Sequence, residues 1–168
     1  MQKIPRPTFA SQLRRSNATL LARFAPWYEY MLTVTFATGG NIKYVPNETA
    51  VHSQIRHLGA TLNSKVWKNR GKFNHKCQIL YVPVIEAAKS ERRIHAHILL
   101  ANVKSQALVE EHMQKYIQNS RCLAERYELS KVYDADGIAC YLSKETGSIN
   151  PDAVAWGLSR IPKSLTSR

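Results

Sequence analysis

Apolar and polar positions alternate with two different periods, and the period changes several times along the chain. Residues 30–37 are rich in β-branched and aromatic side chains and precede a Thr-Gly-Gly-Asn cluster, which predicts a strand followed by a turn. From residue 47 to about residue 67, apolar residues recur every three or four positions, which predicts an amphipathic helix. Two further strands are expected over residues 78–86 and around residues 93–100. The short polar link between them predicts an antiparallel hairpin, and Pro83 places a sheet edge or an irregular rung in its first strand.

The second half of the chain continues this pattern. A second amphipathic helix is expected over residues 105–117 and a strand over residues 128–133. Residues 134–137 read as a turn, residues 138–145 as a short helix and residues 153–159 as a final strand. The resulting order βαββαβ, followed by a helix and a strand, is that of a ferredoxin-like or RRM-like α+β domain. We therefore expect a central antiparallel sheet of about five strands with helices packed on it.

The two ends of the chain differ from this central part. Residues 8–24 carry apolar positions among basic ones, which predicts a partly helical segment that ends before Pro26. The expected organisation is a basic N-terminal arm over residues 1–25, one domain over residues 26–161 and a basic tail over residues 162–168.

The charge of the chain narrows the choice of partners. Lysine and arginine number 24 against 12 aspartate and glutamate residues, so the formal net charge is +12. This excess favours a polyanion, and nucleic acid before a membrane, because neutralised phosphates release counterions. No apolar run approaches the roughly 20 residues of a membrane span, and no signal peptide is recognisable, so we expect an intracellular protein with no membrane partner. The three cysteines are far apart and form no C-x-x-C pair, and they are expected to be reduced.

Two histidines stand in the apolar run from Ile94 to Leu100. Successive side chains of a strand point to opposite faces, so His95 and His97 share one face. If Glu86 lies opposite either histidine in the hairpin, its carboxylate joins them on that face. Two imidazoles and one carboxylate suit Mn²⁺ or Mg²⁺, with Zn²⁺ left open. Glu91 is the competing carboxylate, but it lies in the link between the strands.

A second group of reactive residues lies in the short helix predicted near the end of the chain. Tyr141 and Lys144 are three positions apart and therefore share a helix face. A phenol is a weak nucleophile at neutral pH, and a neighbouring cation helps it to ionise or neutralises charge on an attacked phosphate. This pair is therefore suited to phosphate chemistry.

These residues together resemble the motifs of the HUH endonucleases, and within them those of the single-tyrosine initiator (Rep) proteins of rolling-circle replication. The segment from Ile94 to Leu100 is similar to the family's second motif, and the segment from Tyr141 to Glu145 to its third. The strand Leu32 to Phe36 looks like the first motif, a strand of origin recognition or structural support, and residues 156–160 resemble the closing strand.

The resemblance implies an HUH nuclease fold and an enzyme that nicks and joins single-stranded DNA. His95, His97 and Glu86 would hold Mg²⁺ or Mn²⁺, Tyr141 would attack the DNA, and Lys144 would contact the phosphate. The products would be a 5′-phosphotyrosine and a free 3′-hydroxyl that primes rolling-circle replication of a plasmid, phage or virus. The residues expected to contact DNA are all basic: Lys68, Arg70, Lys72, Arg92, Arg93 and Arg160.

The resemblance also implies partners and a location. The expected substrate is single-stranded DNA at an origin, in a stem-loop. No G-x-x-x-x-G-K-[ST] phosphate loop is present, so a separate helicase, supplied by the host, would unwind the duplex. The protein would act in the cytoplasm of a bacterial or archaeal host, or in the nucleus for a eukaryotic replicon, as a monomer or a dimer.

Two alternatives remain open. A relaxase or an IS200-like single-strand transposase would use the same chemistry on a different DNA. A protein of another class, an RRM-like domain that only binds single-stranded nucleic acid, would stack bases on aromatic side chains. The strand that carries His95 and His97 offers no such aromatic platform.

Overall fold

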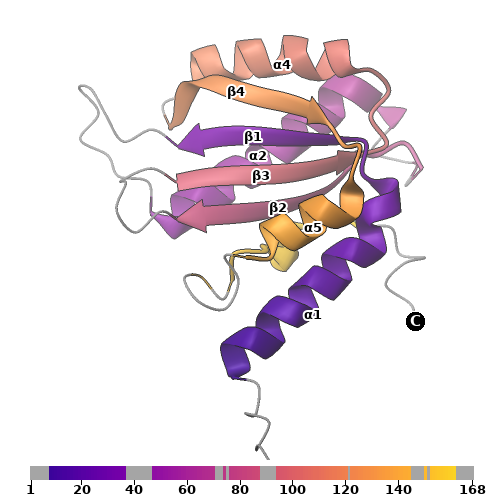
Figure 1. Ribbon diagram of the computed structural model, residues 1–168. Helices are drawn as coiled ribbons and strands as arrows, with labels where there is room; N and C mark the ends of the chain where they lie inside the picture. Colours follow the sequence, from indigo (N-terminus) through magenta and orange to yellow (C-terminus); the bar gives the residue numbers. More distant parts are fainter. Residues whose placement is uncertain are drawn as a thin grey trace, which may run out of the picture.

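The computed structural model describes most of the chain. The described residues are 8–36, 47–70, 74, 76–87, 94–120, 122–144, 150 and 152–161. They form an α+β structure in which one four-stranded antiparallel sheet carries helices on both of its faces (Figure 1).

The sheet has the strand order β2-β3-β1-β4. Its strands are β1 (Tyr30–Phe36), β2 (Leu80–Ala87), β3 (Ile94–Ala101) and β4 (Leu123–Lys131). All three neighbouring pairs are antiparallel. One helix follows β1 and another follows β3, so the element order is the predicted βαββαβ, which is compatible with a ferredoxin-like arrangement.

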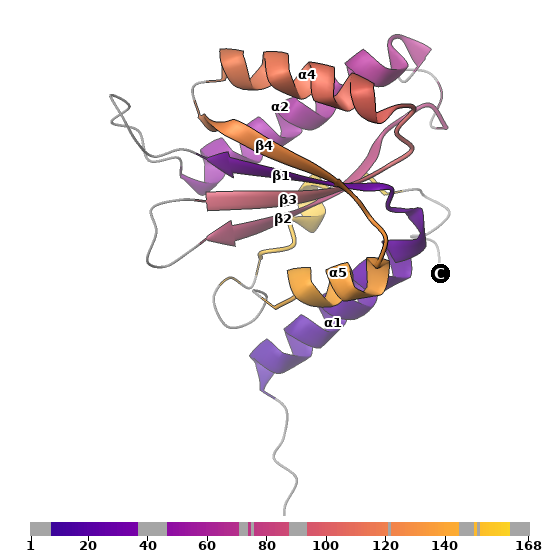
Figure 2. The ribbon, with the colours of Figure 1, turned by 45° about the horizontal axis from the view of Figure 1, so that its top comes forward.

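The helices form two layers, one on each face of the sheet. Helices α2 (Glu48–Trp67) and α4 (Gln106–Asn119) lie on one face. Helices α1 (Phe9–Phe24) and α5 (Ala135–Leu142) lie on the other, as the turned view shows (Figure 2).

The alternation of side chains along β3 sorts them between the two layers. Ala96 and Ile98 are buried in the core under α2 and α4, whereas Leu99 is buried in the core under α1 and α5. His95 and His97 have the same parity as Leu99 and therefore lie on the face of α1 and α5. The helix α5, which carries Tyr141, thus packs on the same face as the two histidines.

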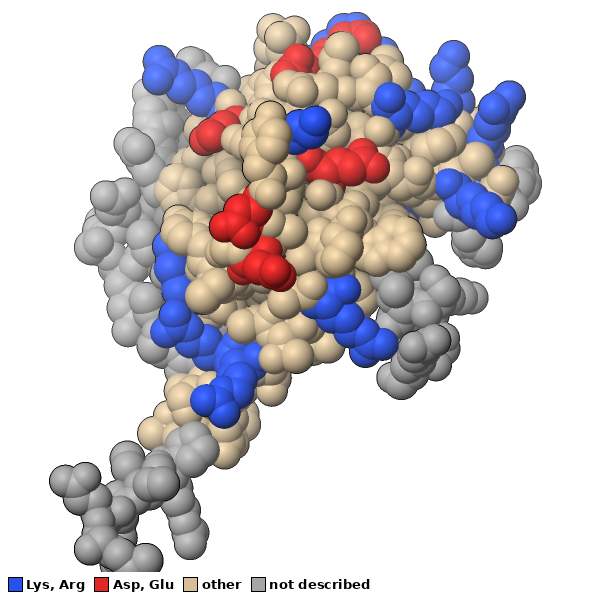
Figure 3. Space-filling view, turned by 45° about the vertical axis from the view of Figure 1, so that its right-hand side comes forward, with Lys and Arg blue, Asp and Glu red and all other residues tan. Residues whose placement is uncertain are grey.

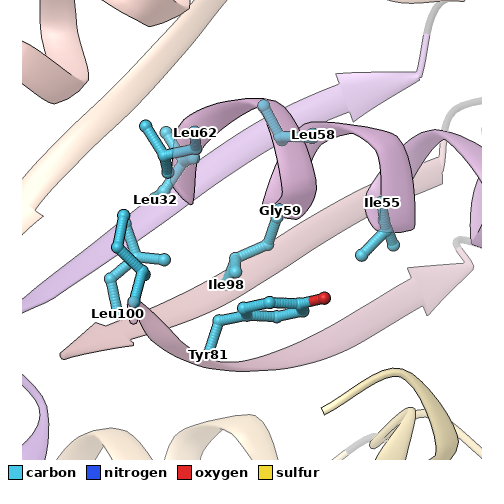
Figure 4. A pocket seen from close by; sticks show the side chains of 9 residues that line it. Leu32, Ile55, Leu58, Gly59, Leu62, Tyr81, Ile98 and Leu100 are labelled. Carbon is cyan, nitrogen blue, oxygen red and sulfur yellow. The ribbon is translucent and has the colours of Figure 1, made fainter. Parts of the chain in front are cut away.

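The predicted helix over residues 47–67 is confirmed almost to the residue. Asn47 caps α2, because its side-chain Oδ1 accepts a hydrogen bond from the backbone N–H of Ala50 at 2.8 Å. In the middle of the helix, Gly59 lies against the ring of Tyr81 from β2 (Figure 4). A Cβ atom at Gly59 would be only 2.7 Å from Cζ of Tyr81, so the close contact between helix and sheet depends on this glycine.

The strand expected over residues 153–159 is only partly formed. Val154 and Arg160 make isolated bridges to Val84 and Tyr81 of β2, and the 3₁₀ turn Trp156–Leu158 interrupts the pairing between them. This segment therefore acts as an interrupted fifth strand along the outer side of β2. It covers the edge of the four-stranded sheet at β2, where the presence of Pro83 had indicated a sheet edge or an irregular rung.

Two other boundaries were predicted wrongly. The strand β4 spans Leu123–Lys131, starting earlier than the expected residues 128–133, and Tyr133 lies beyond it. Residues 134–137 do not form a separate turn, because Asp134 caps α5 and accepts a hydrogen bond from the N–H of Gly137 at 2.9 Å. The helix α5 spans Ala135–Leu142, so it begins and ends about three residues before the predicted helix over residues 138–145. Lys144 follows the helix in a turn.

The two ends of the chain are described only in part. The basic segment predicted over residues 8–24 is the helix α1, which packs against α5. Residues 1–7 and the tail 162–168 lie outside the described residues. Among the helices that are described, none has the length and apolar character needed to cross a membrane.

Candidate active site

Four of the five predicted catalytic and metal-binding residues lie on three elements that the fold brings together at one end of the sheet. Glu86 of β2 is paired directly with His95 of β3, which is one of the two registers that the sequence allows. His97 lies two residues further along β3 on the same face. Tyr141 is in the last turn of α5, above this face. The hairpin register therefore confirms the arrangement of carboxylate and imidazoles inferred from the sequence.

Both histidines are held by threonines of the neighbouring strand β1. Thr33 Oγ1 lies 3.0 Å from Nδ1 of His97, and Thr35 Oγ1 lies 3.0 Å from Nδ1 of His95. These pairs are directly opposite each other in the antiparallel ladder between β1 and β3. Because Nδ1 of each ring is engaged by a hydroxyl, Nε2 is the nitrogen that each ring can offer to a ligand.

Glu86 connects the two groups of residues that the sequence singled out. Its Oε2 lies 3.4 Å from Nε2 of His97, and its Oε1 lies 3.7 Å from Nζ of Lys144. The Glu86 side chain is only 18% exposed, and its Oε1 is buried and accepts no hydrogen bond. A buried carboxylate oxygen without a hydrogen bond is costly unless a cation compensates it.

Tyr141 and Lys144 form a compact pair beside the imidazoles. Nζ of Lys144 lies 3.6 Å from the centre of the Tyr141 ring, and this ring meets that of His97 edge-on with centroids 6.2 Å apart. The tyrosine is 49% exposed, so a substrate from solvent can reach it. Although Lys144 follows the helix rather than lying on it, its ammonium group is placed between the phenol ring and the carboxylate of Glu86.

The residues at this site are of the kinds that would hold a divalent cation. Glu86 would supply a carboxylate oxygen, and His97, whose Nε2 lies 3.4 Å from Oε2 of Glu86, would supply an imidazole nitrogen. The unsatisfied Oε1 of Glu86 and the threonine-held imidazoles are further features of a metal site. As they stand, no three His, Cys, Asp or Glu side chains of the described residues are already grouped as around an ion.

The three predicted DNA contacts that lie within the described residues are not gathered around this site. Lys68 and Arg70 lie at the end of α2, the helix that covers the opposite face of the sheet. Arg160 pairs with Tyr81, five residues before Glu86 along β2 and so roughly 16 Å away along the strand. Lys72, Arg92 and Arg93 lie outside the described residues.

Thr33 and Thr35 are the site residues that the sequence did not assign a role at the histidines. They stand in the segment Leu32 to Phe36, where threonines alternate with apolar residues. This period of two is the same as in the His-x-His strand. Two polar residues at this spacing in each of two strands indicate that each strand has a polar face. The pairing of β1 with β3 then shows that the threonines and the histidines lie opposite each other.

Three groups with shifted pKa values lie away from this site, between α2 and α4. Burial raises the pKa of Tyr116 to about 12, and its hydroxyl lies 2.8 Å from Nδ1 of His57. Burial, together with the positive charge of Lys65, lowers the pKa of His112. Hydrogen bonds from Lys65 and Lys115 lower the pKa of Glu111 to about 2. These groups join the two helices and do not face Tyr141.

Comparisons with models of protein families, with curated proteins and with solved structures find no match to this chain.

Proposed function

We propose that the protein is a metal-dependent endonuclease of the HUH type that nicks and joins single-stranded DNA through Tyr141, and that it initiates rolling-circle replication. The observation that carries the proposal is the position of Lys144. Its ammonium lies 3.6 Å from the Tyr141 ring and 3.7 Å from Glu86, so it connects a solvent-accessible phenol to the carboxylate beside His97. A tyrosine that only packs at a helix end does not require an ammonium group and a buried carboxylate beside its ring.

In the proposed reaction, Oη of Tyr141 attacks a phosphodiester of single-stranded DNA. A bond forms between Oη and phosphorus, and the bond from phosphorus to the 3′-oxygen breaks. The phenolic proton is lost, and the leaving 3′-oxygen gains a proton, so the products are a 5′-phosphotyrosine and a free 3′-hydroxyl. The reverse attack by a 3′-hydroxyl rejoins the strand without ATP, because the phosphotyrosine retains the energy of the diester.

The side chains around Tyr141 have separate parts in this reaction. Lys144 stabilises negative charge on the phenolate and on the attacked phosphate. Glu86, His95 and His97 would hold Mg²⁺ or Mn²⁺, which supplies Lewis-acid polarisation of the phosphate when bound. Thr33 and Thr35 orient the imidazoles through Nδ1.

The experiment is a covalent-adduct assay with the full chain, Mn²⁺ and a library of single-stranded stem-loops. An adduct that survives a denaturing gel is expected when the DNA carries its label at the 3′ end. DNA labelled at the 5′ end should instead give a shorter product that a polymerase can extend. Tyr141→Phe should abolish both products, and removal of the metal with a chelator should do the same.

The chain contains a matched control for this experiment. Tyr133 is 86% exposed, and Nζ of Lys131 lies 5.7 Å from its ring centre, so this pair resembles Tyr141 and Lys144, but neither residue is among the described contacts of Glu86 or the histidines. Tyr133→Phe and Lys131→Met should leave the adduct unchanged, whereas Lys144→Met should slow its formation by a factor of roughly 10² to 10³. An adduct that persists in Tyr141→Phe, or no adduct from the unaltered protein with any DNA, would refute the proposal.

A further inference from the structure

Helix α1 is strongly basic and has no acidic residue. Its sixteen residues, from Phe9 to Phe24, include Arg14, Arg15 and Arg23, and all three are exposed. None of the ion pairs between described residues involves these arginines. The helix therefore presents positive charge that the neighbouring protein does not neutralise.

Among the described residues, the contacts that anchor α1 come from its second half. Leu21 and Phe24 are buried in the core that includes Ala139 and Leu142 of α5. Asn17, which is 5% exposed, accepts a hydrogen bond from Nε1 of Trp156 at 2.9 Å. The first half of the helix extends beyond this anchor, as Figures 1 and 2 show, and Phe9 at its start is 76% exposed.

The extended half of α1 lies on the side of the molecule where α5 ends. The two helices run in opposite directions (Figure 1), so the start of α1 is near the end of α5 that carries Tyr141. Figure 3 shows basic side chains on the lower part of the described surface, where α1 lies in Figure 1. A strand that leaves Tyr141 on this side would therefore pass along α1.

The outward face of α1 has the chemistry of a phosphate-binding surface. At 100° per residue, the side opposite the buried residues carries exposed polar side chains, with the partly buried Ala22 among them: Ser11, Gln12, Arg15, Ser16, Thr19 and Arg23. Arg14 is also exposed and lies 100° around the helix from Arg15. Hydroxyl, amide and guanidinium groups are the donors that bind phosphate oxygens. A helix that lies on a membrane instead turns a continuous apolar face outwards, whereas Leu21 and Phe24 of α1 are buried against α5 and its exposed large apolar side chains are Phe9 and Leu20.

We propose that the first half of α1 binds the phosphates of the single-stranded DNA next to the nick, with Arg14 and Arg15 as the main contacts. The assignment of a nick site beside it rests on the proposed function. The binding of DNA by α1 does not require the nicking reaction at Tyr141, because binding depends only on the positive charge and the polar side chains of the helix. The helix would thus hold the strand in place while its end is attached to Tyr141.

The test measures binding of fluorescent single-stranded DNA by anisotropy at several salt concentrations, in the Tyr141→Phe background so that no covalent adduct forms. Replacing Arg14 and Arg15 by alanine should weaken binding roughly tenfold and reduce the slope of log K against log salt by about 1.4, or about 0.7 for each lost phosphate contact. The matched control is Arg56→Ala with Lys115→Ala on α2 and α4, which removes the same charge from the opposite face. This control should leave the slope unchanged.

Three outcomes overturn the proposal: an unchanged slope in the Arg14 and Arg15 variant, an equal loss in the control, or binding to phosphatidylglycerol vesicles without binding to DNA. Circular dichroism should be the same in both double variants, since all four side chains are exposed. The control also loses the surface ion pair of Lys115 with Glu111, which should change its thermal unfolding only slightly. A reduced salt slope in the Arg14 and Arg15 variant, with an unchanged slope in the control, supports the proposal. If this result is obtained and the unaltered protein forms no covalent adduct, the DNA-binding proposal stands and the proposed nicking activity is wrong.

Discussion

At the scale of single residues, the contacts of Thr33 and Thr35 make their hydroxyls part of the site. A hydroxyl can both donate and accept a hydrogen bond. It can therefore donate to an unprotonated Nδ1 or accept from a protonated one. If the protein binds a metal as proposed, this freedom suits imidazoles whose Nε2 changes partner, at His97 from the Glu86 carboxylate to the ion.

Replacing Thr33 or Thr35 by valine should lower the affinity for Mn²⁺ by roughly ten- to a hundredfold, because the imidazole loses the group that orients it. Calorimetric titration of the DNA-free protein with Mn²⁺ measures this effect. Thr33→Ser keeps the hydroxyl and should restore the affinity. The control is Thr61→Val, because Thr61 Oγ1 lies 3.2 Å from Nε2 of His112 in a similar pair away from the site. Unchanged affinity in both β1 variants would contradict a role in orientation.

The sequence was sufficient to predict which side chains would share one face of the hairpin but not the contacts between them. The common face of His95 and His97 follows from strand alternation, and the short hairpin allows Glu86 opposite either histidine, of which the structure shows His95. The contact of Glu86 with Lys144 joins residues from β2 and from the turn after α5. Such a contact depends on how a helix packs on a sheet, and no local pattern contains that information.

At the scale of elements, the close approach of α2 to the sheet depends on Gly59. Gly59→Ala places a methyl group 2.7 Å from Cζ of the Tyr81 ring, which is buried and has little space to move. Overpacking costs about 1 to 3 kcal/mol, whereas the better helix propensity of alanine recovers about 1 kcal/mol.

Urea denaturation should therefore show that Gly59→Ala lowers the free energy of unfolding by up to about 2 kcal/mol. Gly157→Ala is the matched control, because a Cβ atom at Gly157 would have no atom within 4 Å, and it should change stability by less than about 0.5 kcal/mol. Equal stability of the Gly59 variant and the unaltered protein would show that Tyr81 can move aside.

Long, regular elements were predicted well, and short ones with ambiguous ends were not. The period of α2 continues for twenty residues, so its limits were clear. For α5, Asp134 and Gly137 are typical of a turn, and the same residues also make a helix cap. The start of β4 was missed because its first residues do not alternate between apolar and polar side chains.

At the scale of the whole molecule, the two layers differ in how much apolar surface they bury. The core under α2 and α4 contains about twice as many described buried residues as the core under α1 and α5. The layer that carries Tyr141 is therefore the less strongly held of the two.

Native-state hydrogen exchange should detect this difference. We expect the hydrogen-bonded amides in the last turn of α5 to exchange at least tenfold faster than those around Leu62 in α2. Under the proposed function, such local opening would allow Tyr141 to move between an attacking and a waiting position while the sheet remains intact. Equal protection of both helices would show that the molecule opens only as one unit.

The segment along the outer side of β2 has a further consequence, for the way copies of this chain behave in a crowded solution. Backbone groups of Tyr81, Pro83 and Ile85 are already bonded to residues 153–160, so a strand from another copy finds few unpaired groups on that edge. The opposite edge strand, β4, places Arg126, Glu128 and Lys131 among its apolar residues, and such charges discourage strand addition. Both edges of the sheet are thus protected against edge-to-edge aggregation. Tyr141, at the end of the sheet, nevertheless stays accessible from solvent.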